Sequence, residues 1–381
     1  SATASANTSN QTVCNPNSPR VVFGPDASRQ ANQFFSDTYQ GSVQARLNVG
    51  NHSLKVLGEF EEYRVFNLFV QNALGSYFFD SVADFQNRRA STLTFQNAIS
   101  NVLNDAAANF KTRTYTFGVQ DTWKVTPDVT LTYGARYDLF DQNGVIALNN
   151  FLVNRSNIAN NSTLAGRGLF QPRGGAEWKV NDRLSVRASG GIYGGGSPAV
   201  YISNSYANTG VITNTVNILR NNTVGNTTFQ NSVPQAVGDA ALTNVNGRTI
   251  SPDVQNFLAT NVGALAGSTT NILDPNFKIP AVARATLSAD YRANLGPLGD
   301  GWNFGLAYLF SKQRDQVVFT DIRSVPSGLL LPDGRRRFIQ NPGLTTASNN
   351  VDILTTNSDA GRSHIFVAKF DKRFDFGLYF G

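Results

Sequence analysis

The chain has 381 residues, of which 11% are aromatic and 15% are charged, and its formal net charge is +6. The basic residues are spread over the whole sequence, so the positive charge gives no reason to expect a nucleic-acid partner. No stretch contains the roughly 18–20 apolar residues of a membrane-spanning helix, and the single cysteine, Cys14, excludes an internal disulfide.

The predicted elements begin after residues 1–20, a stretch rich in Ser, Asn and Thr that is predicted to be a loop. Two strands are then predicted at residues 43–49 and 54–60, on either side of the turn Gly50-Asn51-His52. Successive side chains of a strand point to opposite faces. Alternation of apolar and polar residues therefore predicts a sheet with one apolar and one polar face.

The clearest alternation lies in residues 111–140. One parity carries Tyr115, Phe117, Val119 and Trp123, and the other carries Thr116, Gly118, Gln120 and Thr122. The alternation resumes after Thr126-Pro127-Asp128, so residues 111–125 are predicted to pair antiparallel with residues 128–140. The same unit recurs at 169–180 with 182–193, at 281–293 with 302–310, and at 366–374, and a last strand begins near Leu378.

About ten strands are predicted in all, several with the roughly 9–11 residues that a tilted strand needs to cross a bilayer. Their connections alternate between short ones, at 50–52, 125–128, 180–182, 294–301 and 374–377, and long ones, at 69–111, 141–168, 194–280 and 320–362. Short periplasmic turns and long outer loops are typical of outer-membrane barrels. The sequence therefore predicts an all-β fold, an antiparallel transmembrane β-barrel of the bacterial outer membrane with long extracellular loops.

All three tryptophans, Trp123, Trp178 and Trp302, lie beside short turns on the apolar parity of their strands. A tryptophan at the edge of a bilayer keeps its ring among acyl chains and its N–H in water. We therefore predict that these residues form an aromatic girdle at the membrane interface. The alternative is that they are ordinary core residues.

Catalytic and metal-binding motifs are absent from the sequence. His52 and His364 have no metal-ligand neighbours at a useful spacing, and no nucleophile elbow or phosphate-binding loop is present. No cofactor, no metal site and no enzymatic activity are expected. The cluster Arg335-Arg336-Arg337 lies in a long loop. It is interpreted as a solvated loop tip, with contact to lipopolysaccharide or an anionic ligand as the alternative.

Several segments resemble a known family. Residues 117–137 read FGVQDTWKVTPDVTLTYGARY and residues 170–193 read FQPRGGAEWKVNDRLSVRASGGIY, and both resemble barrel hairpins of TonB-dependent receptors. Residues 273–281, LDPNFKIPA, resemble the segment entering a later strand of these receptors. Residues 51–91 and the stretch from Phe23 to Asn32 are similar to the large Oar-like branch. The resemblance covers most of the chain from about Val21 onward.

The resemblance implies a 22-stranded barrel, plugged by an N-terminal globular domain, that imports scarce nutrients with energy from the TonB complex. This chain contains only about half of those strands and neither plug nor TonB box. Residues 1–381 are therefore expected to be part of one outer-membrane β-barrel domain, its middle portion, with the plug domain and the remaining strands absent. The first and last strands are expected to lie apart in an unclosed sheet.

Strand parity predicts which charged residues line the interior of such a barrel. The predicted lumen-lining residues are Arg46, Lys124, Arg136, Asp138, Arg173, Glu177, Arg183, Arg187, Arg284, Asp290 and Arg292, with Lys55, Glu59 and Lys179 on the same parity. This basic interior is interpreted either as a path for an anionic substrate or, the favoured reading, as cations paired with carboxylates of a plug and of neighbouring strands. Asp121 departs from the pattern because it lies on the lipid parity, where headgroups are expected to accommodate it.

Three functions remain open. The leading hypothesis is a receptor or transporter in which the long loops capture an unidentified small ligand or peptide, with outer-membrane lipid, lipopolysaccharide, a plug and TonB as partners. The second is an adhesin or structural barrel that uses the Asn-rich loop at residues 203–276 as a binding surface. The third is a small outer-membrane barrel protease with His364 and Asp359 at its rim, which lacks a partner constellation.

Overall fold

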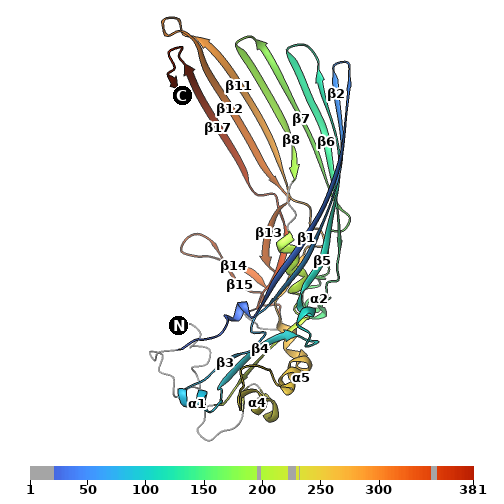
Figure 1. Cartoon of the computed structure of the whole chain (residues 1–381), viewed down its shortest axis with the longest axis vertical. Helices are drawn as coiled ribbons and strands as arrows, with labels where there is room; N and C mark the ends of the chain where they lie inside the picture. Colours follow the sequence, from blue (N-terminus) through green and yellow to red (C-terminus); the bar gives the residue numbers. More distant parts are fainter. Residues whose placement is uncertain (1–20, 195–198, 222–228, 231, 345–349) are drawn as a thin grey trace.

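The computed structural model describes residues 21–194, 199–221, 229–230, 232–344 and 350–381, so the predicted N-terminal loop and Cys14 lie outside the described residues. A ten-stranded sheet forms the wall of the molecule, in the order β1-β2-β5-β6-β7-β8-β11-β12-β17-β18 (Figure 1). These strands are β1 (Ala31–Val49), β2 (His52–Val70), β5 (Ala108–Lys124), β6 (Val129–Asn143), β7 (Arg167–Asn181), β8 (Leu184–Gly194), β11 (Ala281–Asn294), β12 (Asp300–Arg314), β17 (Arg362–Arg373) and β18 (Tyr379–Phe380).

Every neighbouring pair in this sheet is antiparallel, which confirms the predicted fold class. Strand β5 pairs with β6, and β7 with β8, so the two predicted hairpins are also confirmed. The sheet is open. Strand β1 pairs only with β2, and among the described residues no strand joins β1 to β17 or β18, as expected for an unclosed arc.

The strands extend further than the alternation predicted. The strand expected at residues 43–49 is β1, with 19 residues, and its partner β2 also has 19. Two adjacent aromatic residues, Phe34 and Phe35, interrupt the alternation in β1, although both lie in the strand and are exposed. The pairing with β2 continues past them without a shift of register.

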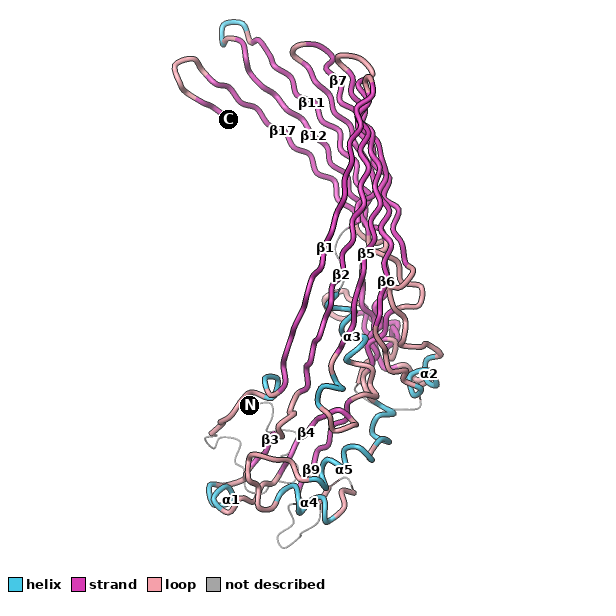
Figure 2. Tube along the Cα trace, turned by 45° about the vertical axis from the view of Figure 1, so that its right-hand side comes forward, coloured by secondary structure: helices cyan, strands magenta, loops and turns pink. Residues whose placement is uncertain are grey.

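The long connections fold into regular elements, for which the alternation gave no signal, at the end of the sheet opposite the short turns (Figures 1 and 2). We call these elements the loop domain. Its helices are α1 (Val82–Gln86), α2 (Asn150–Ser156), α3 (Ala199–Ala207), α4 (Gln235–Leu242) and α5 (Pro252–Thr260). Its strands are β3 (Ser76–Phe78), β4 (Thr92–Ala98), β9 (Thr213–Leu219), β10 (Thr270–Leu273), β13 (Gln316–Asp321), β14 (Ser324–Leu330), β15 (Arg336–Gln340) and β16 (Asp352–Ser358).

Short polar residues start the helices of the loop domain. The Ser81 hydroxyl accepts a hydrogen bond from the Asp84 N–H at the start of α1, and the Asn149 side chain accepts one from Leu152 in α2. Ser251 caps α5, in which Pro252 occupies the first turn, where its missing N–H is not needed. None of the helices in the described part of the chain is long and apolar enough to span a membrane.

The buried hydrophobic clusters lie at the loop end of the molecule. Val65, Phe110 and Phe140 extend the polar parity of β2, β5 and β6 into the loop domain, where they pack in one cluster with Ile202 and Tyr206 of α3. A second cluster joins β4, β9, α4 and α5, and a third lies where β1 and β2 meet β4. The first cluster therefore packs the loop domain against the polar side of the sheet, whereas Ala31, Leu68 and Val70 of the third cluster lie on the apolar parity at the loop ends of β1 and β2.

Away from these loop ends, the apolar side of the sheet has no such covering among the described residues. Phe117 and Phe170 are each 59% exposed, and Leu306 is 65% exposed. A broad exposed apolar face is unfavourable in water, but it suits a wall whose outer face contacts acyl chains.

Candidate functional site

The face of the sheet opposite the exposed aromatics, which we call the polar face, carries all the charged residues predicted to line a lumen. Ten of them lie on strands, and the eleventh, Arg183, lies in the turn between β7 and β8. The ten are Arg46, Lys124, Arg136, Asp138, Arg173, Glu177, Arg187, Arg284, Asp290 and Arg292. That this face lines a lumen remains a prediction.

Part of the charge on the polar face is paired across strands. Arg136 reaches Glu59 at 3.0 Å and Asp138 at 2.7 Å. Asp138 is almost fully buried and also accepts hydrogen bonds from Thr116 and Gln171. Both carboxylate oxygens of Asp138 are therefore held by residues of neighbouring strands, as buried charge requires.

A second paired group lies nearer the short turns. Arg187 contacts Glu177 at 3.3 Å and Asp290 at 2.6 Å, and Lys369 contacts the other oxygen of Asp290 at 3.2 Å. At the short-turn rim, Arg183 contacts Asp300 at 2.7 Å. These groups all retain solvent exposure, so each pair contributes little to stability.

The remaining predicted lumen-lining cations are not paired with carboxylates. Within the described residues, Arg46, Lys124, Arg173, Arg284 and Arg292 form no ion pair. The guanidinium of Arg173 instead lies over the ring of Tyr193, 5.2 Å from its centroid. Neighbouring strands thus neutralise only some of the positive charge on the polar face.

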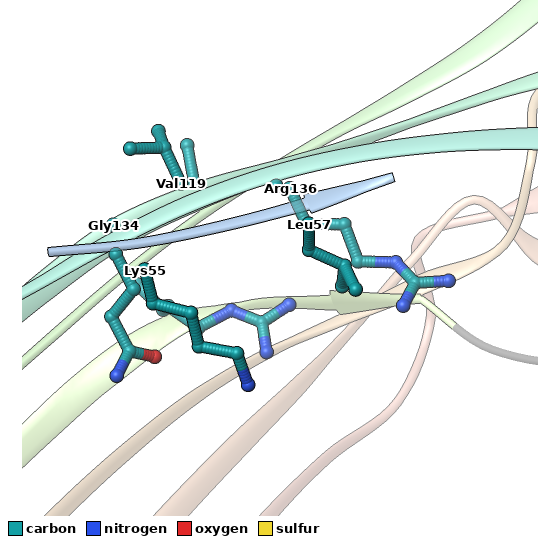
Figure 3. A pocket seen from close by; sticks show the side chains of 9 residues that line it. Lys55, Leu57, Val119, Gly134 and Arg136 are labelled. Atoms are coloured by element: carbon teal, nitrogen blue, oxygen red, sulfur yellow. The ribbon is translucent and has the colours of Figure 1, made fainter. Parts of the chain in front are cut away.

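A shallow hollow of about 150 Å³ opens on the polar face (Figure 3). Lys55, Arg136 and Arg173 lie around it together with Gln120. Its floor is formed where β5 and β6 have glycines, Gly118 and Gly134, on the polar parity. The hollow is thus lined by three cationic side chains and one amide.

The three tryptophans lie beside the short turns, as their sequence positions require. Trp178 is 51% exposed, and Trp302 donates its ring N–H to the Leu298 carbonyl oxygen in the adjacent turn. Trp123 is partly covered, because it stacks on His52 with ring centroids 5.2 Å apart. A membrane-interface girdle made of these residues remains a prediction.

The stacked His52 belongs to a polar cluster that the sequence did not reveal. Asp121 is only 5% exposed, and its carboxylate lies 2.6 Å from the His52 ring nitrogen and accepts a hydrogen bond from Tyr133. Residues of two neighbouring strands hold the Asp121 carboxylate, and its expected place near the periplasmic headgroups stays a prediction. The sequence did offer one signal for this cluster. Asp121 has the same apolar parity as Trp123 and Tyr133, and all three residues lie near short turns.

Towards the loop end, the apolar face ends in a charged network. Glu62 lies 2.6 Å from Arg64 and 2.7 Å from Arg113, and Arg113 also contacts Asp141 at 3.2 Å. Glu62, Arg64 and Arg113 have the same parity as Phe60 and Tyr115, which lie next to them on the short-turn side in β2 and β5. The membrane-facing part of the wall must therefore end on the short-turn side of this network.

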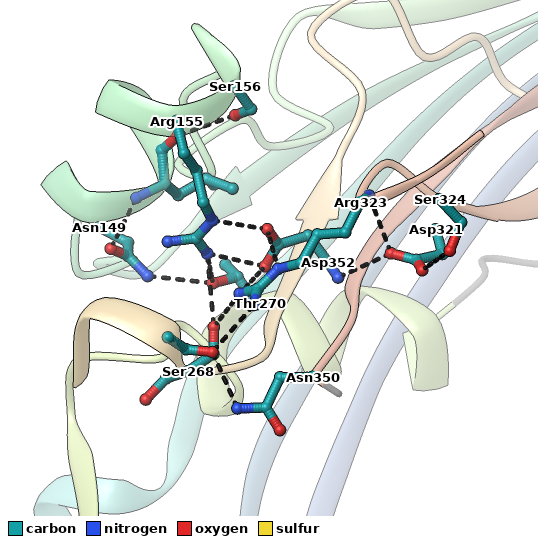
Figure 4. Close-up of polar contacts among 12 residues, drawn as sticks. Asn149, Arg155, Ser156, Ser268, Thr270, Asp321, Arg323, Ser324, Asn350 and Asp352 are labelled. Carbon is teal, nitrogen blue, oxygen red and sulfur yellow. Dashed lines mark hydrogen bonds and ion pairs between the residues drawn. The ribbon is translucent and has the colours of Figure 1, made fainter. Parts of the chain in front are cut away.

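A buried ion network connects three long loops (Figure 4). Asp352, 1% exposed, contacts Arg155 and Arg323 at 2.7 Å each. Arg155 also donates to the carbonyl oxygens of Ala266 and Ser268 in the loop before β10. Burial opposes the charge on Asp352, but the two guanidinium groups outweigh this and hold the pKa of its carboxyl below the ordinary value.

Within the described residues, the two residues considered for catalysis, His364 and Asp359, do not contact each other. The His364 ring nitrogen lies 2.8 Å from the Tyr308 hydroxyl, whereas Asp359 accepts a hydrogen bond from the backbone N–H of Asp315. Where the structure describes the chain, no group of three or more His, Cys, Asp or Glu side chains is placed to hold a metal. The Arg335-Arg336-Arg337 cluster lies in the exposed β14–β15 hairpin, where Arg335 contacts Asp333 at 2.7 Å.

A family model described as "Outer membrane beta barrel domain" matches residues 2–381. The chain belongs to this outer-membrane β-barrel family. It is therefore a protein of the bacterial outer membrane, as predicted from the strand pattern. No curated protein matches the chain.

Among solved structures, this barrel chain is similar to the outer membrane transporter YddB of Escherichia coli, with 14% identity and a TM-score of 0.46 over 89% of this chain and 31% of that one. The chain is also similar to the siderophore receptor PirA of Acinetobacter baumannii, with 12% identity and a TM-score of 0.44 over 90% of this chain and 35% of that one. A mutant of the ferric enterobactin receptor of Pseudomonas aeruginosa shares 10% identity with the chain and has a TM-score of 0.43, over 89% of this chain and 33% of that one. The chain thus spans about a third of the length of these proteins.

Proposed function

We propose that this chain is part of the barrel wall of a TonB-dependent outer-membrane receptor that takes up a ligand. The polar face lines the lumen, the loop domain captures the ligand outside the cell, and a plug domain of the same polypeptide occupies the lumen. Further strands pair with β1 and β18 to complete a barrel near the 22 strands implied by the family resemblance.

The open sheet carries this proposal. A strand edge in lipid leaves its backbone N–H and C=O groups unpaired, at a cost of several kcal/mol for each group. Strands β1 and β18 are both edges of the ten-stranded sheet, and β1 does not pair with β17 or β18. A small closed barrel, the form needed for an adhesin or protease of about ten strands, would use those same edges to close on itself.

Two further observations support the receptor over a simple structural wall. The hairpins β5–β6 and β7–β8 coincide with the segments that resemble TonB-dependent receptors. The polar face also carries more cations than its own carboxylates neutralise, so it has charge available for a plug or a ligand. We propose no catalytic role.

Cross-linking to TonB tests the proposal without knowledge of the ligand. Cells that produce the full-length protein are treated with formaldehyde, and complexes are detected with antibodies to TonB. We expect a cross-linked species that contains both proteins. A porin made in the same cells is the matched control, because it forms a barrel without a plug. If the full-length protein cross-links no more than the porin, the receptor proposal is wrong and the adhesin alternative takes its place.

A further inference from the structure

One line of residues crosses nearly the whole sheet on the polar face. Direct pairing between neighbouring strands links, from β1 to β7, Arg46, Lys55, Gln120, Gly134 and Arg173. From β8 to β17 the line continues through Gly191, Arg284, Ser311 and Ser363. We call this line the basic row. It contains four cations and no carboxylate.

The cations of the basic row have no acidic partner. Within the described residues, neither Lys55 nor any of the three arginines of the row takes part in an ion pair. Arg46 and Lys55 stand directly opposite each other, an arrangement of like charges that destabilises a sheet. Arg136 and Arg187, by contrast, each hold two carboxylates close by. The row is therefore an uncompensated strip of charge beside well-paired groups.

The lines of residues on either side of the basic row keep it free of negative charge. The neighbouring line on the short-turn side is neutral and carries mostly hydroxyl groups, among them Ser53, Thr122, Thr132, Ser189 and Thr286. The line on the loop side includes Arg136 and Gln171, again without a carboxylate. A ligand anion at the row would meet hydrogen-bond donors from both sides and the positive charge of Arg136 from the loop side.

Two glycines keep the basic row open between its cations. At Gly134 a Cβ atom would overlap the backbone oxygen of Val119, and at Gly191 it would lie 2.7 Å from the Cβ of Arg173. The absence of a side chain at Gly134 leaves a hollow that Lys55 and Arg173 help to line, and Figure 3 shows Gly134 and Lys55 beside it. At about 4.8 Å per strand, these two cations lie on strands roughly 14 Å apart.

The basic row also runs along the height of the wall. Lys55 is the fourth residue of β2 from its short turn, and Arg173 is the ninth residue of β7 from its short turn. Arg284 is the eleventh residue of β11 from its short turn, and Ser363 is the second residue of β17 from the loop end. Because barrel strands are tilted, a line perpendicular to them climbs from the short-turn side to the loop side.

We propose that the basic row is a track along which an anionic ligand, carrying at least two carboxylate or phosphate groups, moves from the loop domain to the short-turn end. This inference rests on the proposed receptor function and adds the chemical class of the ligand. The anion binds successive cations as it moves along the wall. The hydroxyl groups of the neighbouring line of residues replace part of its hydration shell.

The test uses pyranine, a fluorescent trisulfonated anion, and the purified full-length protein in detergent. Binding is followed by fluorescence anisotropy at low and at high salt. We expect salt-sensitive binding to the natural protein and a loss of at least tenfold in affinity for the double variant Arg173→Gln/Arg284→Gln. The variant Arg173→Lys/Arg284→Lys keeps the charge and should retain most of the binding.

The matched control is Lys312→Gln. This exposed cation is adjacent to Ser311 on β12 but lies on the other face of the sheet, so its loss should leave binding unchanged. Heat-modifiable migration on gels shows whether each variant has folded. Absence of binding to the natural protein, or equal binding by the natural protein and the Gln variant, overturns the track. If the Gln variant also loses thermal stability while the natural protein does not bind pyranine, acidic groups of the plug occupy the row instead.

The outcomes for the track and for the receptor are separable. Cross-linking to TonB, measured on the same double variant, should remain at the natural level, because Arg173 and Arg284 are the ninth and eleventh residues of their strands from the short turns. Persistent cross-linking without pyranine binding refutes only the track. Pyranine binding without cross-linking of the natural protein refutes the receptor and leaves an anion-binding wall.

Discussion

Gly191 lies where β8 comes close to β7, so a larger residue at this position would collide with the neighbouring strand. A Cβ atom at this position would lie 2.8 Å from the Pro172 carbonyl oxygen and 2.9 Å from the Arg173 Cα, both backbone atoms. We expect Gly191→Ala to lower the free energy of unfolding by about 1–3 kcal/mol, since the two strands must move apart. Urea unfolding in lipid vesicles, followed by tryptophan fluorescence, measures this change.

Gly41→Ala is the control for this prediction. Gly41 also lies within a strand, but a Cβ atom there would meet nothing within 4 Å. We expect its unfolding free energy to remain within about 0.5 kcal/mol of the natural value. Equal effects of the two substitutions would show that strand packing at Gly191 is looser than the structure has it.

Asp121 gives a second prediction at the scale of single residues. Replacing it with alanine leaves the Tyr133 hydroxyl and the His52 ring without their acceptor near the membrane interface. We expect a loss of about 1–3 kcal/mol in the same unfolding measurement. Asp182→Ala, in an exposed turn, is the control and should have almost no effect. A neutral result for Asp121→Ala would mean that water replaces the carboxylate at no cost.

The parity of single residues could be predicted, but their partners could not. Alternation was enough to place Arg136 and Asp138 on one face, because that requires only the period of a strand. The contact of Asp121 with His52 depends on the register between strands 69 residues apart in sequence. The register between two strands is set by the turn and by side-chain packing. The alternation of residues within a single strand contains no information about either.

At the scale of elements, the short turns and their tryptophans predict the depth of the wall in the membrane. In vesicles that contain brominated phosphatidylcholines, we expect the fluorescence of Trp123, Trp178 and Trp302 to be quenched most by bromines near the headgroups. Variants that retain one tryptophan each, with the others changed to phenylalanine, separate the three signals. Strongest quenching by bromines near the bilayer centre for any of them would contradict an interfacial girdle.

The existence and order of the strands followed from alternation, whereas their ends did not. In β1 the adjacent Phe34 and Phe35 break the pattern, so twelve residues preceding Val43, from Ala31 onward, were missed. The helices of the loop domain were also missed, although Ser81 with Asp84 and Ser251 with Pro252 are ordinary start signals. Helices of five to nine residues are too short for an apolar period to emerge.

At the scale of the whole molecule, the Asp352 network makes one unit of three loops. Asp352→Asn removes the charge between two buried guanidinium groups, a change that typically costs about 3–5 kcal/mol. We expect faster hydrogen exchange in α2, β10 and β16 together, because Arg155, Thr270 and Asp352 are joined. Asp333→Asn, in the exposed β14–β15 hairpin, is the control and should affect only its own segment. Faster exchange confined to β16 would show that the loops move independently.

The lowered pKa of Asp352 also sets the pH dependence of this unit. A carboxyl whose folded pKa lies below its unfolded value stabilises fully above the unfolded value, near 3.9, and loses that contribution as the pH falls through the folded one. We expect exchange protection of the loop domain to be constant from neutral pH to about pH 4 and to fall below it. In Asp352→Asn this acid transition should disappear. An unchanged acid transition in the variant would assign it to other carboxylates.

The loop domain could not be predicted as a unit from the sequence. Arg155 and Asp352 are 197 positions apart, and their contact depends on how three loops return to the same place. The membrane wall repeats a two-residue period, so local patterns describe it well. The loop domain has a buried core formed from single residues of distant segments, such as Phe110, Phe140 and Ile202.

The length of β1 and β2 has a consequence beyond transport. Nineteen residues at about 3.3 Å each, tilted by roughly 40°, rise about 48 Å along the barrel axis, while the apolar band of such barrels is about 25 Å tall. In the proposed orientation, some 20 Å of the wall then projects beyond the outer leaflet, and the Glu62, Arg64 and Arg113 network lies on its outer surface. Antibodies and bacteriophages that never enter the barrel can recognise this rim, so selection by them would act on residues that no ligand touches.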